Sequence, residues 1–295
     1  MAAKLALAPI PYFWPKEQIC GFYEQVASWP VEIVYLGETI CAKRRALSFE
    51  QWLEIAQQLA QTGKEVVLST LALLEAGSDI AMLNRICSNR QFAVEANDMA
   101  ATQLLARGTP FVSGPHINVY NEETLALLAE EGAYRWVAPI ELSGATISHL
   151  HARRPAGLET EIYVFGRLPL AFSARCFTAR AHNVAKDQCA FRCADYPDGL
   201  PLWTQEQHRL FTINGVQLQS GLPCNLLDKV RDLVSIGVEV LRISPQSQGT
   251  EQILGIFRAV LDGKIDGDAQ AILSPWAPQG YCNGFWNGDA GMVWR

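Results

Sequence analysis

Four cysteines that could bind a metal stand in two distant segments of the chain. Cys176, Cys189 and Cys193 share one stretch, with 12 and 3 residues between successive thiols, and Cys41 comes much earlier. Thiolates are the soft ligands that zinc and iron–sulfur clusters use, and both centres need four donors at one point. Structural zinc sites usually draw on two close pairs, whereas only Cys189 and Cys193 are close here. The spacing is compatible with an iron–sulfur cluster and with thiols that stay reduced, and it favours zinc less.

The other four cysteines, Cys20, Cys87, Cys224 and Cys282, fit a structural role. They lie among apolar or aromatic residues, where free cysteine is often buried. The prolines in residues 1–15 interrupt the apolar run that a secretory signal peptide would need. We therefore expect a cytoplasmic protein, in which eight cysteines indicate metal binding or burial and not a disulfide framework.

Charge and hydropathy exclude two classes of partner. The 295 residues include 24 basic and 30 acidic side chains, which gives a net charge of −6. Such a surface is a poor partner for duplex nucleic acid, whose binding depends on neutralised phosphates. No run of about 18 apolar residues exists, so we expect no membrane-spanning helix.

Short apolar runs alternate with helical patterns along the chain. One helical pattern begins at Ser48 and Gln51, a capping box, and ends at Gly63. Eight strands with intervening helices predict a single α/β domain over 1–295, a (β/α)8 TIM-like barrel. An open doubly wound sheet is the alternative, but its glycine-rich first turn is missing. The expected strands are 5–9, 32–36, 65–69, 92–95, 111–113, 136–138, 162–165 and 238–243.

A long insertion, residues 167–224, interrupts this rhythm after the seventh strand and carries three of the four candidate ligands. Within it, Asn214-Gly215 between 209–213 and 216–220 predicts a hairpin with a type I′ turn. The insertion leaves the carboxyl end of a barrel strand, the face on which barrel enzymes build their sites. Cys41, just past the second strand, belongs to the same face. The four thiols are therefore expected to converge.

The segments around the cysteines have a distinctive sequence. They are Tyr-Leu-Gly-Glu-Thr-Ile-Cys-Ala-Lys-Arg-Arg at 35–45, Phe-Ser-Ala-Arg-Cys-Phe-Thr-Ala-Arg at 172–180, the thiols Cys189 and Cys193, and Tyr-Cys-Asn-Gly-Phe-Trp at 281–286. These segments resemble the collagenase-like peptidase family, and within it the branch that serves ubiquinone biosynthesis, and the similarity covers essentially the whole chain.

The resemblance implies a [4Fe–4S] cluster on Cys41, Cys176, Cys189 and Cys193. It also implies a heterodimer with the homologous protein UbiU, the lipid-binding protein UbiT as an accessory partner, and ubiquinone precursors as substrates. The implied activity is oxygen-independent hydroxylation, with prephenate as a possible oxygen donor. Two alternatives stay open: a non-catalytic partner subunit whose metal only staples the insertion, and a scaffold protein that holds zinc on four cysteines.

Three further residues are candidates for substrate binding. Arg44 and Arg45 follow Cys41 and could hold a carboxylate through their guanidinium forks. His116 follows the fifth strand, where an imidazole could move protons. The structural alternatives are a solvated basic turn and a hydrogen-bonded loop histidine. Neither His-Glu-x-x-His nor Gly-x-Ser-x-Gly occurs, so we expect no peptidase activity.

The C-terminal segment is rich in aromatic residues, which are enriched in protein interfaces. Trp276, Tyr281, Phe285, Trp286 and Trp294 fall within twenty residues of one another. The sequence leaves open whether they contact a partner or close the side of their own barrel.

Overall fold

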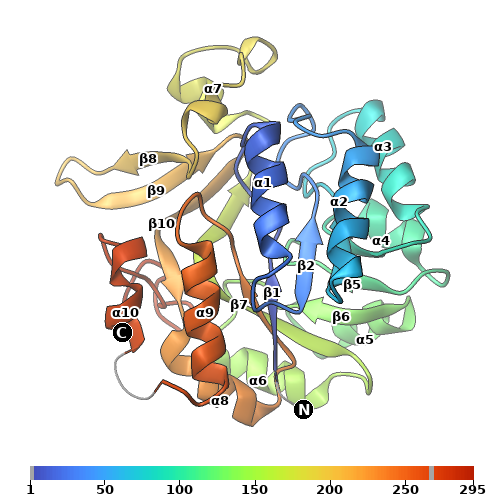
Figure 1. Cartoon of the computed structure of the whole chain (residues 1–295), viewed down its shortest axis with the longest axis vertical. Coiled ribbons are helices and arrows are strands. Elements are labelled where there is room, and N and C mark those ends of the chain that lie inside the picture. The colour runs from blue at the N-terminus through green and yellow to red at the C-terminus, as the bar shows by residue number, and fades with distance from the viewer. Residues whose placement is uncertain (1–2, 266–268) are drawn as a thin grey trace.

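Eight parallel strands close into a barrel at the centre of the molecule (Figure 1). The computed structural model describes residues 3–265 and 269–295. Each strand pairs with the next in sequence, and the last barrel strand pairs with both the seventh and the first, which closes the barrel. The predicted (β/α)8 fold is confirmed. The barrel strands are β1 Lys4–Leu7, β2 Ile33–Leu36, β3 Glu65–Ser69, β4 Ala93–Ala96, β5 Phe111–Ser113, β6 Ala133–Val137, β7 Glu159–Phe172 and β11 Val240–Ile243.

Helices connect the strands and cover the outside of the barrel (Figure 1). The Ser48–Gln51 capping box forms as predicted, with the Gln51 amide donating to the Ser48 hydroxyl. Asn121 caps a later helix in the same way. The covering helices are α1 Lys16–Val26, α2 Phe49–Gln61, α3 Gly77–Cys87, α4 Met99–Leu105, α5 Glu122–Glu130, α6 Gly144–Arg153, α8 Val230–Ile236 and α9 Thr250–Leu261, and the short α10 Ala269–Leu273 precedes the C-terminal segment.

The barrel interior contains a buried network of charges. Arg242 on β11 forms ion pairs with Glu95 and Glu161, and its guanidinium lies 4.0 Å from the centre of the Tyr35 ring. Tyr35 donates a 2.5 Å hydrogen bond to Glu161, and Arg135 donates to Tyr35 over 3.2 Å. Burial alone would lower the pKa of Arg242, but Glu161 and Glu95 raise it above its usual value. Each buried charge therefore has a partner of opposite sign.

The insertion is built on an extension of β7. This strand has 14 residues and outgrows the barrel, so that it pairs with the antiparallel strand β10 Gln217–Asn225. β9 Arg209–Asn214 and β8 Leu200–Trp203 extend the same sheet. Residues 173–199, between β7 and β8 in the chain, form a projecting segment that carries the short helix α7 Phe177–Ala181 (Figure 1).

The predicted hairpin forms, but its turn lies one residue later than expected. Asn214 is the last residue of β9 and pairs with Gln217, so Gly215 and Val216 form the turn. Gly215 has φ +64°, whereas Asn214 does not have positive φ, which excludes the predicted type I′ turn. The reason is tertiary, because the buried Asn214 side chain donates to Pro11 O and Gln217 Oε1 and accepts from Arg44.

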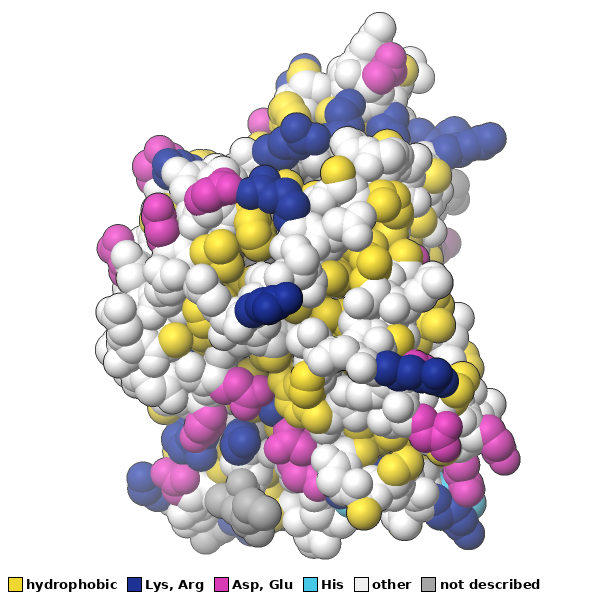
Figure 2. Space-filling view, turned by 90° about the vertical axis from the view of Figure 1, so that its right-hand side faces the viewer, with side chains coloured by type: hydrophobic (Ala, Val, Ile, Leu, Met, Phe, Trp, Pro, Cys, Tyr) yellow, Lys and Arg dark blue, Asp and Glu magenta, His cyan; other side chains and the backbone are white. Residues whose placement is uncertain are grey.

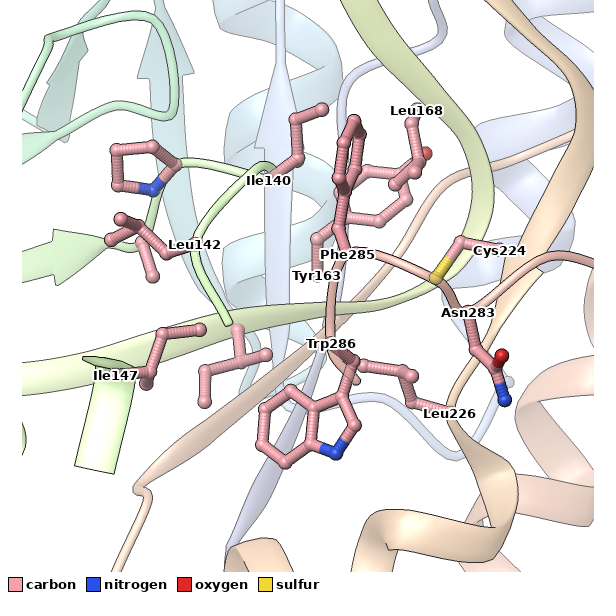
Figure 3. Close-up of a pocket in the computed structure, with 13 residues that line it drawn as sticks. Ile140, Leu142, Ile147, Tyr163, Leu168, Cys224, Leu226, Asn283, Phe285 and Trp286 are labelled. Carbon is pink, nitrogen blue, oxygen red and sulfur yellow. The ribbon is translucent and has the colours of Figure 1, made fainter. Parts of the chain in front are cut away.

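The C-terminal segment closes the side of its own barrel. Cys282 is fully buried, and its backbone bonds to Pro223 on one side and Asn225 on the other. Figure 3 shows Phe285 and Trp286 in an apolar cavity with side chains of the barrel wall. A Cβ atom on Gly144 would lie 2.6 Å from the Trp286 ring, so the contact is close. Phe285 and Trp286 are therefore partly buried and pack against the core of this chain, whereas Trp294 is exposed.

Candidate metal centre

The four candidate cysteines line one small cavity at the base of the projecting segment. Cys41 comes from the loop after β2, Cys176 from the start of α7, and Cys189 and Cys193 from the turns that follow. Cys176 is buried and the other three are half-buried. The fold therefore brings the four thiols together around one cavity, although Cys41 and Cys193 are 152 residues apart in sequence.

The loop that carries Cys41 is held by a carboxylate. Glu38 accepts hydrogen bonds from the backbone amides of Ile40 and Cys41, at 2.8 and 3.0 Å. Arg44 then donates its own amide to Cys41 O at 2.9 Å, which closes the turn. Burial raises the pKa of Glu38, and Arg44 opposes this shift. Glu38 therefore positions Cys41 through the backbone.

The thiols of the insertion are positioned by α7 and the hairpin turn. Cys176 Sγ accepts a hydrogen bond from the Ala179 amide at 3.4 Å, so the sulfur caps the first turn of α7. The amide of Gly215 donates to Thr178 Oγ1 at 3.0 Å, which holds α7 against the hairpin.

Arg44 forms part of the cavity wall and is almost fully buried, at 4% exposure. Its terminal nitrogens donate to Pro11 O at 2.9 Å and Asn214 Oδ1 at 2.8 Å. A Cβ atom at Gly215 would lie 2.7 Å from Nη2 of Arg44, so a glycine is required there for space as well as for φ. Both terminal nitrogens are thus bonded within the chain, and substrate binding by Arg44 stays a prediction.

Burial is the main influence on the pKa of two of the cavity thiols. It raises the pKa of the Cys41 and Cys193 thiols, and Arg44 lowers both in return. A metal ion deprotonates the thiols that bind it, because the cation compensates the thiolate charge that burial penalises. Arg44 supplies one further positive charge beside these sulfurs. The thiolate form of these cysteines is therefore favoured in the cavity only when a cation lies beside the sulfurs.

Basic residues surround the cavity. Figure 2 shows Lys and Arg side chains gathered around the base of the projecting segment. Lys43 and Lys186 also fasten this segment to the barrel: Lys43 donates to Lys186 O at 2.9 Å, and Lys186 forms an ion pair with Glu75 of the barrel. A negatively charged centre would therefore lie in a positive field.

The other two predicted site residues lie outside the cavity. Arg45 is exposed. His116 packs edge-on against Phe172 with 4.8 Å between ring centroids, and Phe172 in turn contacts the apolar residues around Cys176. Burial lowers the pKa of His116 to about 4, so its imidazole is neutral at pH 7. Their part in substrate binding stays a prediction.

Two residues that shape the site escaped the sequence analysis. Glu38 was expected only as part of the segment before Cys41, and Asn214 only as a turn residue. The one signal for Glu38 was its place three residues before a candidate ligand, where a carboxylate can accept amide bonds from a turn. Nothing in the sequence indicated that Asn214 would meet Arg44, 170 residues away.

The fold and the cavity define a (β/α)8 barrel protein with a thiol-lined pocket on the carboxyl face of its strands. The family model for Peptidase family U32 matches residues 23–294. The chain therefore belongs to this family. Across the residues that the structure describes, no helix is both long and apolar enough to cross a membrane.

Solved structures with similar folds have low sequence identity to this chain. A structure titled as the U32 peptidase Mk0906 is 10% identical, with a TM-score of 0.47, and the match covers 84% of this chain and 95% of that one. Dihydropteroate synthase from Thermus thermophilus is 13% identical, with a TM-score of 0.40, covering 88% and 94%. N-acetylneuraminate lyase from Aliivibrio salmonicida is 12% identical, with a TM-score of 0.36, covering 92% and 77%.

Proposed function

We propose that this chain acts as UbiV, the iron–sulfur partner of UbiU in oxygen-independent hydroxylation of ubiquinone precursors in the cytoplasm. The observation that carries the proposal is the single cavity lined by Cys41, Cys176, Cys189 and Cys193. Its position in a U32-family barrel and the sequence resemblance around these residues support the same reading. The proposal includes UbiT as the lipid-binding accessory protein and prephenate as the oxygen donor.

The donor set, four cysteines around one cavity, is one that a [4Fe–4S] cluster uses. Over residues 3–265 and 269–295, no three His, Cys, Asp or Glu side chains lie close enough together to hold one metal ion. A tetrahedral zinc ion would draw its four sulfurs to about 2.3 Å from one point. In a [4Fe–4S] cluster each thiolate binds a different iron, so the four sulfurs stand farther apart around a larger centre. What supports the cluster is that four cysteines line one cavity, because four thiolates are the ligand set of a [4Fe–4S] cluster.

A bound cluster would supply one-electron transfer, and the residues of this chain would control its charge and surroundings. Arg44 places a permanently charged guanidinium beside the sulfurs, and the Ala179 amide donates to Cys176. Both interactions favour added negative charge and so raise a reduction potential. Val216 is buried in an apolar cluster with Cys176, and Phe191, although 41% exposed, lines the cavity.

A purely structural cluster is the second candidate. The short helical turns at Lys186–Gln188 and Arg192–Asp195 bury no side chain, so the segment around Cys189 and Cys193 has little core of its own. A cluster that joins this segment to the Cys41 loop would stabilise it whether or not it transfers electrons. Catalysis would then rest with UbiU.

Anaerobic purification with and without UbiU tests the proposal. We expect about four irons and four sulfides per chain, as a [4Fe–4S] cluster requires, copurification with UbiU, and hydroxylated precursor when prephenate is supplied to the complex. If the chain contained iron and sulfide but neither bound UbiU nor supported hydroxylation, the functional proposal would be contradicted. The proposal of a cluster would not be affected. Stoichiometric zinc without sulfide would contradict both.

A further inference from the structure

Two arginines outside the thiol cavity share a second cavity and lack acidic partners. Arg167 on β7 and Arg209 on β9 line a space of about 140 Å³ near the end of β11. Among the described residues, no carboxylate lies within ion-pair distance of either guanidinium, although other arginines of the barrel are paired. Arg167 donates to Gly221 O, and Arg209 to Gln279 Oε1 over 3.1 Å. Each guanidinium is thus bonded to a neutral acceptor, and the nearest carboxylate in the cavity, that of Asp198, acts on Arg209 without forming an ion pair.

The only acidic side chain among those lining this cavity is already engaged. Asp198 accepts hydrogen bonds from the amide and hydroxyl of Ser247. Arg209 Nε is buried and has no hydrogen-bond partner. Burial and, after it, repulsion from Arg167 lower the pKa of Arg209 to about 10, although Tyr12 and Asp198 act in the opposite direction. Two half-buried guanidiniums facing one space are costly unless an anion lies between them.

A larger apolar groove adjoins this cavity. Its volume is about 690 Å³, and its walls include Leu168, Leu170, Phe211 and Phe285. Arg209, Leu222 and Gln279 line both spaces, so the charged cavity and the groove are adjacent at these residues. The groove lies between the β8–β9 hairpin, which projects beside the barrel in Figure 1, and the C-terminal segment. Trp203 and Met292 remain exposed at its edges, at 42% and 55%.

We propose that these two spaces form one binding site for an organic acid with an apolar body. The carboxylate lies between Arg167 and Arg209, whose planar forks match its geometry, and the apolar body lies in the groove. The site combines a few fixed polar groups with apolar walls, as small-molecule sites usually do. The inference rests on charge and shape alone, and it stands apart from the function proposed for the thiol cavity.

Equilibrium dialysis of the whole protein with labelled octanoate tests the proposal. We expect one saturable site that binds octanoate at least about tenfold more tightly than acetate, because burying methylene groups is favourable. Arg209→Gln and Arg167→Gln should each weaken octanoate binding about tenfold or more, since each removes a charged hydrogen-bond donor. Arg90→Gln, which changes an exposed arginine outside both spaces, should have no effect.

Three further probes separate the parts of the proposal. Octanol lacks the charge, so its weaker binding should be the same in Arg209→Gln as in the wild type, which also shows that the variant is folded. Ala290→Phe narrows the groove and should reduce octanoate binding while acetate binding is unchanged. Inorganic phosphate should compete poorly. If either glutamine variant does not fold, the corresponding lysine variant, which keeps the charge and loses the fork, should still bind octanoate more weakly.

Wild-type affinity for octanoate in both folded arginine variants would overturn the proposal. Equal binding of acetate, phosphate and octanoate would overturn it as well, because the site would then recognise a small anion only. Both outcomes leave the iron content of the protein unaffected, so they are distinguishable from failure of the proposed function.

Discussion

The barrel interior and the projecting segment differ in what stabilises their buried polar groups. Inside the barrel, Glu95 and Glu161 form ion pairs with Arg242, and Arg135 lies close to Glu161, so the carboxylates have cationic partners from the chain itself. In the projecting segment, Cys189 and Cys193 lie on helical turns that bury nothing, and three of its residues have left-handed backbone: Asn183, Ala190 and Phe191. The comparison indicates that the barrel is complete by itself and that the segment depends on what its cysteines bind.

The largest effect is expected from the barrel network. Arg242→Met leaves Glu95 and Glu161 buried without their shared cation and should lower the free energy of unfolding by about 3–5 kcal/mol. Arg85→Met removes an exposed ion pair with Glu50 and should cost under about 1 kcal/mol. Urea unfolding measures both. If both variants lost a similarly small amount of unfolding free energy, the buried ion pairs of the barrel would not contribute to its stability.

The next effect concerns the projecting segment alone. Cys176→Ala should remove most of the iron, and amide exchange over residues 174–199 should become fast while the barrel strands stay protected. Cys20→Ala, at a half-buried position outside the cavity, should keep both iron and protection. Exchange and iron analysis on the same anaerobic samples measure this. Unchanged protection of the segment in an iron-free Cys176→Ala protein would mean that packing orders it.

The barrel was predictable from sequence because its signals are local and repeated. Every expected strand was found, and the capping box at Ser48 formed. The convergence of Cys41 with the insertion followed from barrel topology, since both segments leave the carboxyl ends of strands. The turn at Gly215 was wrong by one residue because Asn214 is held by a contact with Arg44 from another part of the chain. Arg167 and Arg209 gave no signal, since neither stands in a motif.

A smaller effect on the free energy of unfolding is expected at acidic pH. The folded chain holds the pKa of His116 at about 4, below the ordinary value of 6.5, so the unfolded chain takes up a proton first as pH falls. Stability is unaffected above pH 6.5 and decreases between pH 6.5 and 4, by about 3 kcal/mol. His116→Asn should lose this dependence, whereas His208→Asn, at an exposed position, should follow the wild type. If the free energy of unfolding of His116→Asn decreased between pH 6.5 and 4 as much as that of the wild type, His116 would not be the group responsible.

The smallest effect tests Arg44, which joins the two regions. Arg44→Lys keeps the charge but loses one of two hydrogen bonds, to Pro11 or to Asn214, and should cost about 1–2 kcal/mol of unfolding free energy. Iron should be retained, and the reduction potential should shift by less than in Arg44→Gln, which removes the charge. Anaerobic voltammetry measures the shift. Equal potentials for both variants would mean that the guanidinium charge does not act on the cluster.

Iron and sulfide analysis of the anaerobically purified chain, together with its visible spectrum, tests the central claim most directly. The account predicts about four irons and four sulfides per chain and a broad absorption near the violet that bleaches on reduction. It further predicts that changing any one of Cys41, Cys176, Cys189 or Cys193 to Ala removes most of the iron. A colourless protein, or full iron in two of those four variants, would contradict it.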